Sequence, residues 1–324
     1  MSELHFPVMS RIFVFGDGAE VTSYSTETQS WTVLQPMTDI RSYATAATLG
    51  FGSDGDAVVT AMRTVLALTH FPPGLLPLIS SFLGPDWIVV AGGQWSDARV
   101  TVTTLWYSLD TRSWRSHNVP SMWIGRFAST CVAVGGRMMV FGGRDMVIDR
   151  QHLCYLVSCE AFDLVTNEWS PLPPMSTPRA YACAAAWRGR SFVFGGWNSG
   201  LCGLASAECF DSKMNRWSFI PSMSTARYSA AAVAVAGGII VMGGYGKYGD
   251  QLQSAELYDP TCNQWTTMTW QLPTPLASFA AHCIDGVLHV IGHKECWSMD
   301  LGAAVPVWLP LPPREGRVMA SVTV

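Results

Sequence analysis

The chain has 324 residues, 49% of them hydrophobic and only 14% charged, which is ample material for a buried core and excludes a disordered chain. Its formal net charge is −4 and no basic run stands out, so binding of nucleic acid through phosphate neutralisation is disfavoured. Nine cysteines form no disulfide-like framework, which favours a reducing cytosol and therefore a cytoplasmic protein. We expect no secretory signal, and the longest uncharged run, residues 64–85, contains prolines that suit a membrane span badly.

The first predicted unit begins at its second strand, with the sequence IFVFGD, and continues to Trp31. In the second unit Arg41 and Gly92 are 51 residues apart, which is 16 residues plus an insertion of 35. This insertion, residues 50–85, should lie between strands one and two. We expect it to be mainly helical, because the segment AVVTAMRTVLALTH is rich in helix-forming residues and a proline pair follows it. Its composition fits a cap packed on the fold, a partner-binding helix pair, or an error in the gene model.

The clearest repeats follow, and each begins at an arginine: Arg126, Arg179 and Arg227. In all three, a Gly-Gly doublet begins 16 residues after the arginine, and a tryptophan comes after the doublet. The sixth unit keeps this spacing between Leu276 and Gly292 but lacks the arginine. Tryptophans mark six units in total, at positions 31, 114, 169, 217, 265 and 308.

Each unit consists of four predicted short strands separated by turns rich in Gly, Asn, Asp and Pro, which indicates an all-β meander. Repeats of about 45–50 residues with this layout are typical of propeller blades, so we expect a six-bladed β-propeller. The C-terminal segment VMASVTV follows Arg317 as a first strand follows the arginine elsewhere. We infer that residues 318–324 supply the first strand of the N-terminal blade and close the ring.

The segments SAECFDSKMNRWSFIPSMSTAR and SAELYDPTCNQW resemble the Kelch repeats of BTB-Kelch ubiquitin-ligase adaptors. The resemblance covers most of the chain and implies a single Kelch propeller domain over residues 1–324, although we expect no BTB or BACK domain before the repeats. It also implies a non-enzymatic protein–protein interaction module that binds a peptide segment of a partner. The implied role is that of a substrate-recognition subunit of a ubiquitin ligase, with cullin-ligase components as further partners.

The repeated arginines follow strand four, and the serine of the S-[AC]-E motif ends the connection after strand two, so both should surround one mouth of the propeller. Kelch adaptors that resemble this chain use these positions to hold acidic or polar peptide segments, and the guanidinium fork suits carboxylates. Loop aromatics on the same mouth match the composition of binding hot spots. The predicted partner-binding residues are Arg41, Arg126, Arg179, Arg227, Arg317, Ser158, Ser206, Ser254, Trp197 and Tyr245. The alternative is that each arginine bonds backbone carbonyls at the blade junction.

Two other functions stay open at this point. Other Kelch proteins bind actin, so one alternative is an actin or cytoskeletal scaffold, and a second is a sugar mutarotase of the sialic-acid type. The sequence contains no nucleophile elbow, phosphate loop or convincing four-ligand zinc set, so we expect no catalytic residues, no cofactor and no metal. We expect a protein or peptide partner, and neither nucleic acid nor a membrane.

Overall fold

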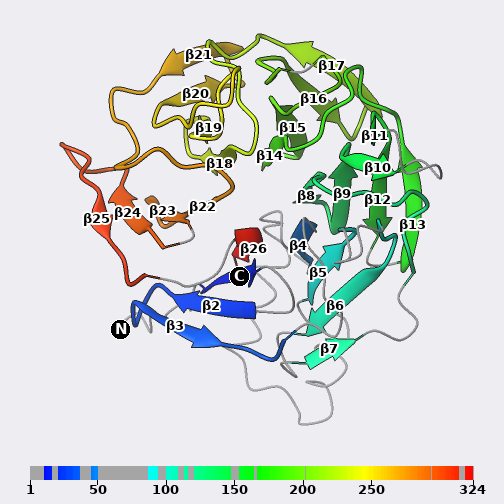
Figure 1. Cartoon of the computed structure of the whole chain (residues 1–324), viewed down its shortest axis with the longest axis horizontal. Coiled ribbons are helices and arrows are strands. Elements are labelled where there is room, and N and C mark those ends of the chain that lie inside the picture. The colour runs from blue at the N-terminus through cyan, green and yellow to red at the C-terminus, as the bar shows by residue number, and fades with distance from the viewer. Residues whose placement is uncertain are drawn as a thin grey trace, which may run out of the picture.

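Four-stranded antiparallel sheets follow one another around a ring in the computed structural model of the chain (Figure 1). The structure describes residues 11–16, 21–36, 45–49, 87–93, 100–108, 113–115, 120–146, 153–163, 166–200, 202–292, 294–313 and 318–323. These residues form six such sheets, named blades 1 to 6 in chain order, together with one two-stranded sheet and no helix. The expectation of an all-β fold built from four-stranded blades is confirmed for this part of the chain.

Each blade has its first strand near the centre of the ring and its fourth strand at the rim (Figure 1). In that order, blade 1 contains β26 (Val318–Thr323), β1 (Arg11–Gly16), β2 (Val21–Ser25) and β3 (Ser30–Val33), and blade 2 contains β4 (Thr45–Leu49), β5 (Trp87–Ala91), β6 (Thr104–Ser108) and β7 (Ser113–Arg115). Blade 3 contains β8 (Thr130–Val134), β9 (Arg137–Phe141), β12 (Cys159–Asp163) and β13 (Glu168–Leu172), and blade 4 contains β14 (Cys183–Trp187), β15 (Arg190–Phe194), β16 (Ala207–Asp211) and β17 (Arg216–Ile220). Blade 5 contains β18 (Ala231–Val235), β19 (Gly238–Met242), β20 (Ala255–Asp259) and β21 (Gln264–Thr267), and blade 6 contains β22 (Ala280–Ile284), β23 (Val287–Ile291), β24 (Cys296–Asp300) and β25 (Leu309–Pro310).

The turn between the third and fourth strands explains the N-x-W motif of the repeats. Asn167, Asn215 and Asn263 have φ angles of 57°, 50° and 59°, in the left-handed region that asparagine tolerates better than most residues. The chain therefore reverses at the asparagine, and the tryptophan two residues later enters the fourth strand at the rim.

The six marker tryptophans join neighbouring blades. Each indole Nε1–H donates to a backbone carbonyl of the segment that leaves the fourth strand of the preceding blade, at 2.7–3.1 Å. The donor and acceptor pairs are Trp31 and Pro312, Trp114 and Gln35, Trp169 and Pro120, Trp217 and Pro173, Trp265 and Pro221, and Trp308 and Gln271. Because the first pair links blade 1 to blade 6, the same contact occurs at every junction around the ring.

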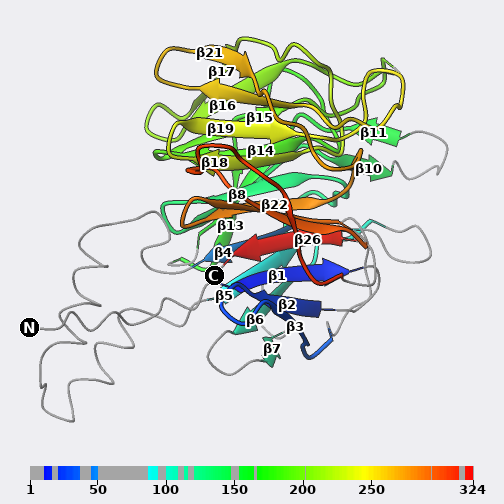
Figure 2. The ribbon, with the colours of Figure 1, turned by 90° about the vertical axis from the view of Figure 1, so that its left-hand side faces the viewer.

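The C-terminal strand β26 pairs with β1, as the sequence analysis inferred for this segment. The antiparallel register runs from Ile12 opposite Thr323 to Phe15 opposite Ala320, and Gly16 lies opposite Val318 after a register shift. Figure 2 shows β26 (red) beside β1 (blue). That this pairing keeps the ring closed stays a prediction about stability.

The glycine doublets allow adjacent blades to approach closely. Gly195 has a φ of +59°, and a Cβ atom at this position would lie 2.2 Å from the carbonyl oxygen of Arg227 in the next blade. Gly196 donates its N–H to the same carbonyl at 2.8 Å. Any larger side chain at position 195 would therefore separate blade 4 from blade 5.

We expect Gly195→Ala to lower the free energy of unfolding by about 1–3 kcal/mol, because it combines a left-handed backbone with a clash against backbone. Gly189→Ala is the matched control, since Gly189 also has a positive φ of +75° but a Cβ atom there would have no neighbouring atom within 4 Å. Urea unfolding of both variants measures the difference. Equal destabilisation of the two variants would show that the close approach at Gly195 has no energetic cost.

The expected insertion, residues 50–85, lies outside the described residues, between β4 and β5 of blade 2. Its predicted helical character therefore stays a prediction. Within the residues that the structure does describe, no helix is long and apolar enough to cross a membrane.

Candidate functional site

The predicted arginines of blades 3, 4 and 5 are buried side chains with partners inside their own blade. Arg179 is 1% exposed, and its Nη1 donates to the carbonyl oxygens of Gly195 at 2.7 Å and Ser206 at 3.0 Å. Its Nη2 donates to the Ser206 hydroxyl at 3.3 Å and to Glu208 Oε1 at 2.8 Å. Both terminal nitrogens of this guanidinium thus have acceptors within the blade.

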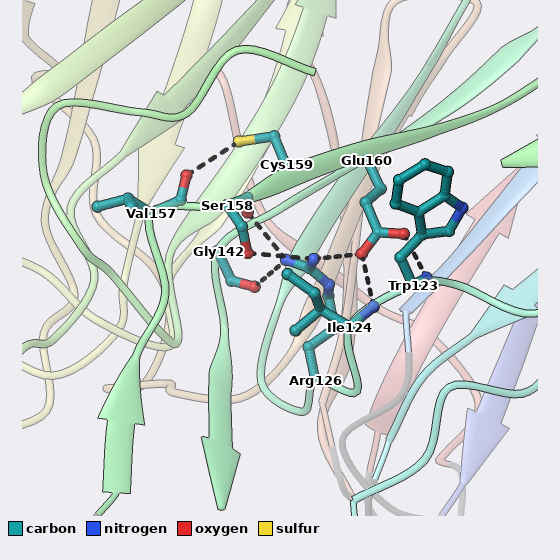
Figure 3. Close-up of polar contacts among 8 residues, drawn as sticks. All are labelled: Trp123, Ile124, Arg126, Gly142, Val157, Ser158, Cys159 and Glu160. Atoms are coloured by element: carbon teal, nitrogen blue, oxygen red, sulfur yellow. Dashed lines mark hydrogen bonds and ion pairs between the residues drawn. The ribbon is translucent and has the colours of Figure 1, made fainter. Parts of the chain in front are cut away.

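The same arrangement recurs in the two neighbouring blades. Figure 3 shows Arg126 between the end of β9 and the start of β12, with Nη2 at 2.6 Å from Glu160 Oε1. In blade 5, Arg227 Nη2 lies 3.1 Å from Glu256 Oε1. Burial lowers the pKa of Arg179 and Arg227, and the paired glutamate opposes that change.

The glutamates also hold the segment by which the chain enters each blade. Glu208 accepts the backbone N–H groups of Ser176 at 2.7 Å and Thr177 at 3.1 Å, just before Arg179. Glu160 accepts those of Trp123 and Ile124 in the same way (Figure 3). Each buried Arg–Ser–Glu triad, consisting of the arginine, the serine and the glutamate of one blade, therefore ties the entering segment to the third strand.

This geometry matches the alternative in which the arginines bond carbonyls inside the fold. A buried guanidinium whose terminal nitrogens already have acceptors is not offered to the carboxylate of a partner, so we do not include Arg126, Arg179 and Arg227 in the binding surface. Arg41 and Arg317 lie outside the described residues. The serines of the triads are half-buried, and each hydroxyl accepts from its arginine.

A signal for the structural role was present in the sequence. In blades 3, 4 and 5 the backbone carbonyl of the serine accepts the N–H of the first glycine of the doublet. In blade 6 the backbone carbonyl of Glu295 accepts the N–H of Gly292 in the same way, so Glu295 takes the place of the serine. Leu276 then replaces the arginine, and Trp297 replaces the glutamate. In blade 6 all three members of the triad are thus replaced, while blade 2 keeps Arg41 with Leu105 in the place of the glutamate, so the signal lies in the comparison of blade 6 with blades 3 to 5.

The connections after strand two and after strand four emerge at the same end of the ring, which we name the upper mouth. The residue after each arginine and the residue after each doublet form isolated β-bridges there, between Phe127 and Arg144, Ala180 and Trp197, and Tyr228 and Tyr245. Trp197 and Tyr245, both predicted as binding residues, therefore occupy equivalent places in blades 4 and 5. Arg144 occupies that place in blade 3.

Three aromatic rings of the upper mouth form a contiguous surface, which we name the aromatic arc: Trp197, Tyr228 and Tyr245. The Trp197 ring meets the Tyr228 ring edge-on at 4.8 Å between centroids, and the Tyr228 and Tyr245 rings stack at 5.0 Å. All three side chains are half-buried, so each ring also presents atoms to solvent. Stacked rings with exposed area are suited to contact apolar or planar groups of a ligand.

Arg144 lies on blade 3, the blade before this arc, in a small hairpin that no sequence pattern predicted. The hairpin consists of β10 (Arg144–Met146) and β11 (Leu153–Tyr155), in which Arg144 lies opposite Tyr155. The guanidinium carbon is 5.0 Å from the ring centre of Tyr155, 5.6 Å from that of Phe127 and 5.9 Å from that of Tyr181. Among the described residues Arg144 forms no ion pair, and its Nε has no hydrogen-bond acceptor.

A series of backbone hydrogen bonds links neighbouring blades below the upper mouth. Ala128, Tyr181, Ser229 and Ser278 have φ angles of 52–54°, each two residues after the repeat's arginine or its replacement. The N–H of Tyr181 donates to Ala128, that of Ser229 to Tyr181, and that of Ser278 to Ser229, at 2.8–2.9 Å. Non-glycine residues in this region are uncommon and often occur at functional sites, where the surrounding structure holds them in place.

Burial raises the pKa of the Cys159 and Cys183 thiols, beside the triads, to about 12, so they stay protonated and are poor nucleophiles. No three His, Cys, Asp or Glu side chains of the described residues gather in a way that could hold a metal ion. What the upper mouth does offer is a cation held by aromatic rings and the aromatic arc.

Most of the chain matches a known family of repeat domains. Residues 80–292, about two thirds of the chain, match the KLHDC2/KLHL20/DRC7 Kelch-repeats domain. The match includes all of the residues of the triads, of the aromatic arc and of the hairpin that carries Arg144. No curated protein matches the chain.

Proposed function

We propose, since this chain belongs to the KLHDC2/KLHL20/DRC7 Kelch-repeats family, that its upper mouth binds a short peptide segment of a partner protein. Kelch domains are generally protein-binding modules and are typically non-catalytic. We propose the same for this chain, in a reducing compartment such as the cytosol. The support for that compartment is that all nine cysteines are free thiols.

The observation that carries the proposal is the presence, on neighbouring blades of one mouth, of Arg144 and the aromatic arc. The arginine is held by three rings and has no acidic partner among the described residues, so its charge is available to an acidic group of a ligand. The aromatic arc would contact an apolar side chain of the same ligand. Arginine, tryptophan and tyrosine are the residues that most often carry binding energy at protein interfaces.

In this proposal the triads support the binding surface but their arginines do not contact the ligand. They fix the entering segments and the doublets, and the residues next to these elements are Arg144, Trp197, Tyr228 and Tyr245. The half-buried serines Ser158, Ser206 and Ser254 stay candidates for a direct contact, because a hydroxyl that accepts one hydrogen bond can still donate another.

The test compares the partners captured in cells by the full chain and by Arg144→Ala/Tyr245→Ala, using proximity labelling and mass spectrometry. We expect a discrete set of partners to disappear in the double variant, because both the charge and the stacked ring are lost. Arg137→Ala is the control, since Arg137 is an exposed arginine at the opposite end of blade 3. Identical partner sets for all three proteins would exclude the upper mouth as the binding site.

The adaptor-like repeats support a more specific proposal, that the bound partner is a ubiquitin-ligase substrate. In that case cullin-scaffold components should be labelled by both the wild type and the double variant, while substrates are labelled only by the wild type. Capture of partners without any ligase component would instead make this chain a binding module outside the ubiquitin system.

A further inference from the structure

The end of the ring opposite the upper mouth, which we name the lower face, carries a basic cluster on blade 4. There the turn between β14 and β15 and the turn between β16 and β17 lie side by side, because Trp187 pairs with Arg190, Arg190 with Asp211 and Asp211 with Arg216. Besides Arg190 and Arg216, the first turn contains Arg188 and the second contains Lys213. The blade 4 cluster consists of Arg188, Arg190, Lys213 and Arg216, all exposed.

The cations of the cluster are poorly neutralised. Asp211 is the one acid in the two turns, and its Oδ1 accepts the N–H groups of Lys213 at 3.0 Å and Met214 at 3.1 Å. Its Oδ2 lies 3.8 Å from Arg190 Nε, which is a loose ion pair. Within the described part of the chain, Arg188, Lys213 and Arg216 form no ion pair with a carboxylate.

The equivalent ends of the neighbouring blades 3 and 5 have a negative net charge. In blade 3 the corresponding row contains Arg137, Asp163 and Glu168, and Arg137 pairs with Asp163 at 2.8 Å, which leaves one negative charge. In blade 5 the row contains one charged residue, Asp259. Four cations and one acid give blade 4 a charge of +3 at this end, on a chain whose total is −4. The cluster is therefore an isolated basic patch with acidic borders.

Apolar contact area accompanies the charge. The Arg188 guanidinium carbon lies 4.3 Å from the ring centre of Trp187, which orients the guanidinium against the indole. Met214, in the second turn, is 63% exposed. Arginine, tryptophan and methionine are enriched in the cores of protein interfaces, whereas a purely solvating basic surface would not need the latter two.

We propose that the blade 4 cluster is a second docking site, and that it takes an acidic, extended segment of a partner protein. Four strands spaced by about 4.8 Å span roughly 14 Å, which an extended segment of about four or five residues covers. Nucleic acid fits less well, because a phosphate backbone continues past the patch onto acidic borders at Asp163, Glu168 and Asp259. Because the cluster lies at the opposite end from the upper mouth, the chain can hold two segments at once.

The test uses a fluorescein-labelled peptide of about six glutamates and measures its fluorescence anisotropy with the full chain. We expect binding that weakens as salt rises, and a loss of affinity of at least about tenfold in Arg188→Gln/Lys213→Gln/Arg216→Gln. The neutral glutamines leave the turns intact, and an unchanged melting temperature checks this. Lys294→Gln removes an exposed cation from the connection between β23 and β24, is the matched control, and should bind the peptide as the wild type does. Arg144→Gln reports separately on binding at the upper mouth.

Three results would overturn the proposal. If Arg144→Gln loses the peptide and the triple variant keeps it, the acidic segment binds at the upper mouth. If single-stranded DNA of equal charge displaces the peptide and binds more tightly, the cluster is a nucleic-acid site. If the wild type does not bind the peptide at low salt, the cluster is not a docking site. Lys213→Glu, a single exposed change, provides a second variant that should also weaken binding.

Discussion

Removal of residues 318–324 is expected to abolish cooperative folding of the chain. The deletion takes away β26, which pairs with β1 at five positions and also lies against the innermost strands of blades 2 and 6. Each backbone hydrogen bond contributes about 0.5–1.5 kcal/mol net to stability. The sum over the hydrogen bonds between β26 and β1 therefore approaches the free energy of unfolding of a whole domain, about 5–15 kcal/mol. The deletion would also expose the edge of β1 to pairing between molecules. Circular dichroism melting and size-exclusion chromatography measure both effects.

A second deletion serves as the control. Removal of residues 51–84, in the connection between β4 and β5, takes away more of the chain but leaves every described strand in place. We expect this variant to stay folded, with a melting temperature close to that of the wild type. If the C-terminal deletion melts like the wild type, the pairing of β26 with β1 does not close the ring. If the control collapses, the insertion belongs to the core.

Glu208→Ala is expected to destabilise the fold by about 3–5 kcal/mol, because it leaves the guanidinium of Arg179 buried without its counter-charge. The substitution also removes the acceptor of the Ser176 and Thr177 N–H groups, so the segment that enters blade 4 should loosen. Urea unfolding followed by tryptophan fluorescence measures the change in midpoint at constant slope. A loss below about 1 kcal/mol would show that the triad contributes no more than an exposed ion pair does.

Two further variants separate pairing from burial. Arg137→Ala breaks the exposed Arg137–Asp163 pair and should cost about 1 kcal/mol or less. Arg179→Leu/Glu208→Leu removes both charges of the buried pair, and we expect it to be more stable than Glu208→Ala alone. The reason is that blade 6 already has Leu276 and Trp297 at these two places. A double variant as unstable as the single one would assign the loss to the missing hydrogen bonds rather than to an unpaired charge.

The positions of the strands could be predicted closely from local patterns. The constant spacing from arginine to doublet places the first two strands, and the asparagine two residues before Trp169, Trp217 and Trp265 places the last turn of blades 3, 4 and 5. The pairing of the C-terminal segment with the first unit also followed from counting strands in the repeats. The hairpin of β10 and β11 could not be predicted in this way, because it is the one two-stranded sheet among the described residues and carries no repeated motif.

The burial of Arg126, Arg179 and Arg227 could not be predicted from the sequence, for a physical reason. The residue types, arginine and serine, were those that hold carboxylates, but the sequence does not show that an internal glutamate already occupies each arginine. Arg144 was not among the predicted residues, although it holds the same place after a doublet as Trp197 and Tyr245, because its surroundings are contributed by three separate segments.

The sequence by itself determined the all-β class and the repeat with its six marker tryptophans, because hydrogen-bonded strands and turns impose a local period that can be read residue by residue. Only the tertiary structure decided which charges face solvent. Arg179 is neutralised by Glu208, 29 residues away, whereas Arg144 and Arg188 lie against aromatic rings and form no ion pair in the part of the chain that the structure describes. Burial and charge pairing depend on which segments fold together, and the same residue type therefore stabilises the interior of one blade and keeps an unpaired charge on another.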